Sequence, residues 1–142
     1  MPSELRIHAV HVGGMRMTAG NGEHALTADY PLQADEKAAG LKPLELLLAS
    51  VATCGGSVVA LLLGRTRQPV SGLEVNVRGT RRDEHPTVFT EIAVEFVVRG
   101  AGVDPLAVQK AIAQADEKLC PVWAMLKPGT PITTSYRTEE ST

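Results

Sequence analysis

The chain has 142 residues, the size of one domain, and its formal net charge is −2 with a pI near 6.1. This charge, and the lack of a basic stripe interleaved with aromatic residues, argues against a nucleic-acid partner. Aromatic residues make up only 4% of the sequence, so the core is expected to be aliphatic. No internal repeat or low-complexity linker divides the sequence, which predicts a single domain over residues 1–142.

The N-terminal part of the sequence is typical of strands joined by turns. Apolar and polar residues alternate over residues 5–10, and the pairs Gly13-Gly14 and Asn21-Gly22 mark turns toward two further extended segments. The first ten residues are too charged for a signal peptide, so we expect a cytoplasmic protein. In that compartment disulfides are usually transient and functional, so the two cysteines are better explained by chemistry or by burial than by a structural disulfide.

The segment Leu46–Leu63 contains eighteen residues without a charge. As a helix it would be about 27 Å long, which is just enough to cross the apolar part of a bilayer. However, no Trp or Tyr flanks the segment, and Gly55-Gly56 interrupts its centre. We therefore expect no membrane association, and predict a helix from Pro43 to about Arg67 that is buried on all sides.

The remaining sequence predicts two strands, two helices and a final strand. Residues 72–79 and 88–100 alternate between apolar and polar side chains, as expected for an antiparallel hairpin with one wet face. Asp104-Pro105 marks a helix start, Pro121 restarts a short helix, and residues 131–138 form the last strand. The buried face of the first of these helices is expected to carry Val108, Ala111, Ile112, Ala115 and Leu119. This order of elements predicts an α+β fold.

Two cysteines are the first candidates for chemistry. Cys54 precedes Gly55 and Gly56, and each glycine inside a helix costs about 1 kcal/mol relative to alanine. The glycines therefore indicate close approach of another backbone or of a ligand, and we expect clearance for the helix that carries Cys120. Cys54 on its own is better explained as a small buried apolar residue, with the glycines making room for a crossing helix.

Cys120 directly precedes Pro121, so it occupies the cap position of the restarted helix. Backbone N–H groups and the helix dipole at that position favour a thiolate, although a structural cysteine at a kink is the alternative interpretation. If the two thiols touch, a sulfenic acid formed on one of them can condense with the other to a disulfide.

The four histidines do not form a metal-binding pattern. His8, His11, His24 and His85 contain no pair at helical ligand spacing, and His8 and His11 would point to opposite faces of a strand. A zinc site made from the cysteines and histidines is therefore a minor alternative, and neither a metal nor a cofactor is expected.

Three segments together, "PLELLLASVATCGG", "HPTVF" and "DEKLCPVWAML", resemble the OsmC/Ohr family, and the resemblance extends from about Arg16 to Tyr136. It implies an OsmC-like fold, in which antiparallel sheets wrap around two long central helices in an intertwined homodimer. It also implies thiol-dependent reduction of organic hydroperoxides, with a small or protein dithiol as the reductant.

The resemblance assigns a role to each candidate catalytic residue. Cys54 matches the peroxide-attacking cysteine, Cys120 the resolving cysteine, and Arg16 in "GGMRM" the arginine that holds the thiolate. The peroxidases carry a glutamate directly after the helix proline, where this chain has Leu44. In this chain the carboxylate is one residue later, at Glu45, which lies about 100° further round the helix. The sequence is thus more similar to the OsmC-like branch than to the well-described peroxidases.

Physical chemistry supports the need for a cation beside Cys54. Burial in an apolar helix raises the pKa of a thiol, and an arginine at contact distance would offset that cost without losing its own proton. The same apolar surroundings favour bulky organic peroxides over hydrogen peroxide. The departure at Leu44 leaves two alternatives open: a non-catalytic dimer that binds an apolar small molecule in its interface cleft, or a thiol redox sensor.

Overall fold

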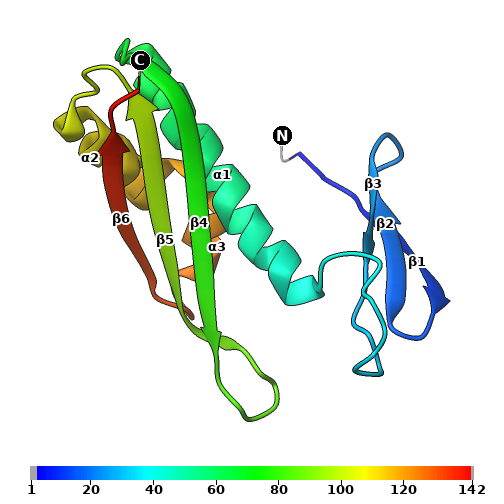
Figure 1. Cartoon of the computed structure of the whole chain (residues 1–142). Coiled ribbons are helices and arrows are strands. Elements are labelled where there is room, and N and C mark those ends of the chain that lie inside the picture. The colour runs from blue at the N-terminus through cyan, green and yellow to red at the C-terminus, as the bar shows by residue number, and fades with distance from the viewer. Residues whose placement is uncertain (1–2, 142) are drawn as a thin grey trace. The chain divides into compact units, whose positions relative to one another are not determined.

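The computed structural model describes residues 3–141 of the chain. Their contacts divide the chain into two compact units, residues 1–47 and 48–142. The boundary lies inside the longest helix, α1 (Pro43–Arg65), which is drawn in cyan to green in Figure 1.

The N-terminal unit is a three-stranded antiparallel sheet, as the alternation and turn signals predict. Its strands are β1 (His8–Gly13), β2 (Arg16–Gly20) and β3 (Ala25–Ala28), in the order β1-β2-β3. The turns lie where glycine is needed, since Gly14 and Gly22 have φ of 54° and 99°.

This N-terminal sheet has no apolar core within the single chain. Asp29 is the one residue of its described part that is buried. Apolar side chains remain largely exposed on its strands and on the segment before them, namely Leu5, Ile7, Val10, Val12 and Leu26. Within the described residues, this unit is therefore held by strand hydrogen bonds and polar contacts more than by apolar burial.

The C-terminal unit is built on a second three-stranded sheet with the order β4-β5-β6. β4 (Val70–Arg81) and β5 (Phe89–Gly100) form the predicted antiparallel pair, but β6 (Ile132–Glu139) runs parallel to β5. The expectation of purely antiparallel sheets is thus wrong. The helices between β5 and β6 form a crossover, which returns the chain in the same direction as a parallel pair requires.

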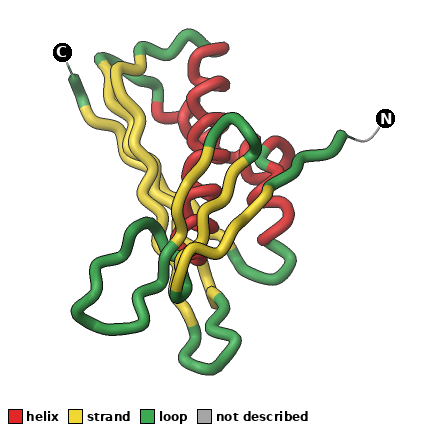
Figure 2. Tube along the Cα trace, turned by 90° about the vertical axis from the view of Figure 1, so that its right-hand side faces the viewer, coloured by secondary structure: helices red, strands yellow, loops and turns green. Residues whose placement is uncertain are grey.

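Those helices and α1 lie against one face of the sheet (Figures 1 and 2). The side chains of β5 predicted to point inward are all buried, at 1% exposure or less, and α1 and the crossover helices bury apolar side chains of their own. Val97 is buried as well, on the opposite face, where it pairs with Glu74 and Arg137 of the neighbouring strands. The inward set is Ile92, Val94, Phe96 and Val98.

The prediction of α1 itself is confirmed, but its expected burial on all sides is wrong for the single chain. Its buried residues form one stripe, and Leu61 on another side is 55% exposed. By length and composition α1 would suffice to cross a membrane, and 22% of that apolar stretch is buried. The buried stripe is Val51, Gly55, Gly56, Val59 and Leu63.

The crossover begins with an α-helix, as predicted, and continues with a π-helical turn. In α2 (Pro105–Gln114), the carboxylate of Asp104 caps the helix by accepting the backbone N–H of Leu106 at 3.0 Å. The next turn, η1 (Ala115–Leu119), is π-helical, and the short helix α3 (Pro121–Leu126) follows it.

The π-helical turn corrects one predicted core residue. The backbone N–H of Cys120 donates to the carbonyl of Ala115, five residues back, at 3.0 Å. Leu119, the last residue of this wider turn, is 47% exposed instead of buried, because the turn does not follow the α-helical spacing on which the prediction rested. Ala115 keeps its predicted place and is fully buried.

Candidate functional site

The two cysteines, far apart in the sequence, meet in the C-terminal unit. Cys54 lies in the middle of α1 and is half-buried, whereas Cys120 lies between η1 and α3 and is 2% exposed. Both are free thiols, and Cys54 lies near enough to Cys120 to raise the pKa of its thiol. The structure therefore brings together the pair of thiols that the redox hypothesis requires.

A glycine and a tryptophan allow this approach. A Cβ atom at Gly55 would lie 2.8 Å from Cε2 of Trp123, too close for a side chain. The indole Nε1 of Trp123 donates to the carbonyl oxygen of Val51 at 3.0 Å, which ties α3 to α1. The expected clearance for the helix after Cys120 is thus confirmed at Gly55. Gly56 instead faces Val75 of β4, so that part of the expectation is wrong.

The surroundings of Cys120 keep its proton on the sulfur. Burial, together with the hydrogen bond and charge of Cys54, raises the pKa of Cys120 to about 11. The backbone N–H groups of Trp123 and Val122 act in the opposite direction but do not prevail. The thiolate predicted for this helix start is therefore wrong, because burial outweighs the helix terminus. At neutral pH Cys120 is a hydrogen-bond donor.

Arg16 forms an ion pair inside the N-terminal unit. Its Nε lies 3.3 Å from Oδ2 of Asp29, which is 5% exposed and also accepts the backbone N–H of Ala39 at 2.9 Å. The hydrogen bond from Ala39, followed by the charge and hydrogen bond of Arg16, holds the pKa of Asp29 below its usual range despite burial. Asp29 was not predicted from the sequence. The one sequence feature that could have indicated it is its position, an acidic residue directly after a predicted strand.

Glu45 has a structural partner at the start of α1. Its Oε1 accepts the backbone N–H of Lys42 at 2.9 Å, which is one half of a capping box. Arg16 and Glu45 thus belong to the N-terminal unit, and Cys54 and Cys120 to the C-terminal unit. The catalytic roles of all four residues remain predictions.

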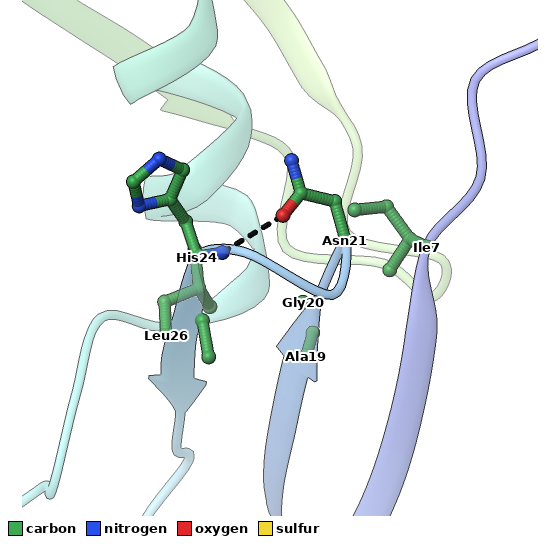
Figure 3. Close-up of a pocket in the computed structure, with 7 residues that line it drawn as sticks. Ile7, Ala19, Gly20, Asn21, His24 and Leu26 are labelled. Carbon is green, nitrogen blue, oxygen red and sulfur yellow. Dashed lines mark hydrogen bonds between the residues drawn. The ribbon is translucent and has the colours of Figure 1, made fainter.

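The N-terminal unit also contains a shallow apolar pocket of about 240 Å³, shown in Figure 3. At one end Oδ1 of Asn21 accepts the backbone N–H of His24 at 2.8 Å. The pocket has no thiol or carboxylate in its lining, so it offers nothing to redox chemistry. Its lining residues are Ile7, Ala19, Gly20, Asn21, His24, Ala25 and Leu26. Across residues 3–141, no three His, Cys, Asp or Glu side chains are grouped to hold a metal ion.

Comparison with known proteins identifies relatives over most of the chain. A family model described as OsmC-like protein matches residues 34–135. Protein YhfA of Escherichia coli K12 is 36% identical over 94 residues, which cover 66% of this chain and 70% of YhfA. A hypothetical protein from Aquifex aeolicus VF5 has a TM-score of 0.89 and 27% identity, over 99% of this chain and all of that one.

The same fold occurs in the organic hydroperoxide resistance protein OhrB of Bacillus subtilis. Its TM-score is 0.65 at 21% identity, over 95% of this chain and 98% of OhrB. At that identity the similarity concerns the fold alone.

Proposed function

This chain belongs to the OsmC-like protein family, and on that premise we propose that it reduces organic hydroperoxides through Cys54 and Cys120. The observation that carries the proposal is the proximity of a half-buried thiol and a fully buried one, which the packing of Trp123 against Gly55 brings together. Organic hydroperoxide resistance proteins share this fold, which adds support. No bound cofactor takes part in the proposed reaction.

The first step is attack of the Cys54 thiolate on one peroxide oxygen. The O–O bond breaks, the sulfur gains that oxygen, and the other oxygen leaves as an alkoxide that takes up a proton to become an alcohol. Cys54 is thereby oxidised by two electrons to a sulfenic acid.

The second step joins the two cysteines. The sulfur of Cys120 attacks the sulfur of Cys54, the S–O bond breaks, and hydroxide leaves with the proton of Cys120 as water. An external dithiol then reduces the resulting disulfide by thiol–disulfide exchange and is itself oxidised to a disulfide.

The environments of the two thiols favour this order of roles. A peroxide can reach Cys54 more readily than Cys120, which is 2% exposed. The raised pKa of Cys120 keeps it protonated at neutral pH, so that it can donate a hydrogen bond to a thiolate on Cys54. We assign the attack to Cys54 and the resolving step to Cys120.

We also infer that the protein works as a homodimer. The apolar surface of α1 outside its buried stripe, including Leu61, is exposed in the single chain, and the N-terminal sheet lacks an apolar core. A second copy would cover such surface. Sedimentation should therefore give twice the mass of the chain, and a stable monomer would contradict this inference.

The peroxidase proposal is tested with one equivalent of cumene hydroperoxide added to the reduced protein. We expect intact mass to fall by two hydrogens per chain, with loss of both free thiols. Cys54→Ser should show neither change, whereas Cys120→Ser should accumulate a sulfenic acid that a 1,3-dione captures. Hydrogen peroxide is expected to react more slowly.

Unchanged thiols in folded protein would contradict the peroxidase and favour a binding dimer. Arg16→Gln tests the role that the resemblance assigns to Arg16, with slower sulfenic acid formation as the expected result. If Arg16→Gln reacts at the wild-type rate, another group stabilises the thiolate.

A further inference from the structure

The π-helical turn before Cys120 leaves the backbone carbonyl of Asp116 without a helical donor. In an α-helix the carbonyl of Asp116 would accept the N–H of Cys120, but that N–H donates to Ala115 instead. In a π-helix the donor would be residue 121, which is proline and has no N–H. The carbonyl of Asp116 therefore needs a partner from outside the turn.

Lys127 provides that partner. Its Nζ donates to the carbonyl oxygen of Asp116 at 3.0 Å and to the carboxylate Oδ1 of the same residue at 2.9 Å. The backbone N–H of Lys127 donates to the carbonyl of Trp123 at 2.9 Å, so its main chain belongs to the end of α3. One residue thus connects the far end of α3 to the turn that precedes Cys120.

The contact between Lys127 and Asp116 links the two ends of the segment that contains the resolving cysteine. Cys120 lies between Asp116 and Lys127 in the chain, and Trp123 anchors the same short segment to α1. If the contact with Lys127 is lost, the turn can revert toward an α-helical register, which rotates Cys120 about the helix axis.

We propose that Lys127 is a positioning residue that holds the π-helical turn and so sets the thiol of Cys120 against Cys54. The inference rests on the proposed function for its catalytic consequence. The equilibrium between the two thiols and their disulfide does not depend on the peroxide, and it measures the positioning directly.

The experiment compares Lys127→Met with wild type by equilibrating the full-length protein in dithiothreitol redox buffers. We expect the equilibrium constant for the disulfide to fall about tenfold, which raises the reduction potential by about 30 mV. Closure of the disulfide after cumene hydroperoxide should slow by a similar factor, while trapping of the Cys54 sulfenic acid keeps its rate.

Three further variants separate positioning from general effects. Lys127→Arg keeps donors at the same place and should restore most of the wild-type potential. Asp116→Asn removes the carboxylate but keeps the carbonyl, so its shift should be smaller than that of Lys127→Met. Lys118→Met removes an exposed lysine from the same turn and should leave the potential unchanged. If Lys127→Met does not fold, Lys127→Gln is measured and is expected to shift the potential in the same direction.

The outcomes distinguish this inference from the proposed function. A folded Lys127→Met protein with wild-type potential and closure rate overturns the role of Lys127 and leaves the peroxidase standing. A shifted potential in a protein whose thiols ignore hydroperoxide supports the role of Lys127 and rejects the peroxidase.

Discussion

The two units of this chain bury opposite kinds of groups. All the buried apolar side chains of the described chain belong to the C-terminal unit, whereas the N-terminal unit buries a single carboxylate, Asp29. The key residue of the C-terminal unit is Trp123, which fills the space above Gly55. Substitutions in the C-terminal unit should therefore act through packing, and substitutions in the N-terminal unit through hydrogen bonding and pH.

The largest effect is expected for Gly55→Ala. The added methyl would overlap the ring of Trp123, and overpacking of this kind costs about 1–3 kcal/mol of stability. Gly64→Ala in the same helix is the matched control, because a Cβ there meets nothing within 4 Å. It should stabilise by roughly 0.5–1 kcal/mol through helix propensity. Urea denaturation measures the free energy of unfolding of both variants. Equal changes in the two would contradict a packing constraint at Gly55.

The next effect is expected in the thiol pair. Because the pKa of Cys120 is about 11, only about one thiol in a thousand is ionised at pH 8. Iodoacetamide at pH 8 should therefore modify Cys54 long before Cys120, and the rate at Cys120 should rise steeply between pH 9 and 11. Peptide mapping by mass spectrometry gives both rates. Equal rates at pH 8 would show that burial does not control the pair.

The raised pKa of Cys120 also predicts that the folded chain loses stability at alkaline pH. Between the ordinary thiol pKa near 9 and the folded value of about 11, the unfolded chain loses the Cys120 proton while the folded chain keeps it. Stability should thus be fully present below pH 9 and fall toward pH 11. Cys120→Ser is expected to weaken this alkaline loss.

A more local effect is expected for Asp29→Ala. The substitution leaves Arg16 and the N–H of Ala39 without their acceptor, so amide exchange in residues 32–40 should accelerate about tenfold. Exchange in β5 should not change. Asp35→Ala, an exposed aspartate of the same loop, is the control. If β5 also loses protection, the polar contact supports more than its own unit.

The charge of Asp29 also predicts a pH dependence. Its pKa is lowered in the folded chain, so its contribution is present above the unfolded value of about 3.8 and is lost as pH falls through the folded value. Protection of residues 32–40 in the wild type should therefore decrease below pH 4. The Asp29→Ala protein should lack this acid transition.

The smallest effect is expected on the outer face of the C-terminal sheet. Arg99 bridges Glu74 at 2.9 Å and Glu139 at 3.0 Å, and both contacts are solvent-accessible. Exposed ion pairs contribute little, so Arg99→Met should change Tm by about 2 °C or less. A larger loss would show that the C-terminal unit depends on polar contacts as well as on its core.

Most helices and strands could be predicted from local patterns, because alternation, Pro43 and Asp104 act over a few residues. The direction of β6 could not, since it depends on the path of the whole crossover. Leu119 was misplaced because the π-helical turn depends on Pro121 and on the distant side chain of Lys127.

The candidate site was likewise predictable only in part. The resemblance indicated Cys54 and Cys120, but their proximity depends on how α3 packs on α1, and no spacing in the sequence encodes it. Asp29 escaped notice because its partners, Arg16 and Ala39, lie 13 and 10 residues away in the chain.

The position of Trp123 gives the protein an optical property. It is the single tryptophan of the chain, it is fully buried, and it lies three residues from Cys120 and against Gly55, the neighbour of Cys54. Sulfur groups quench indole emission at short range, and a disulfide quenches differently from two thiols. The fluorescence of the unlabelled protein should therefore follow the oxidation state of the cysteine pair in real time.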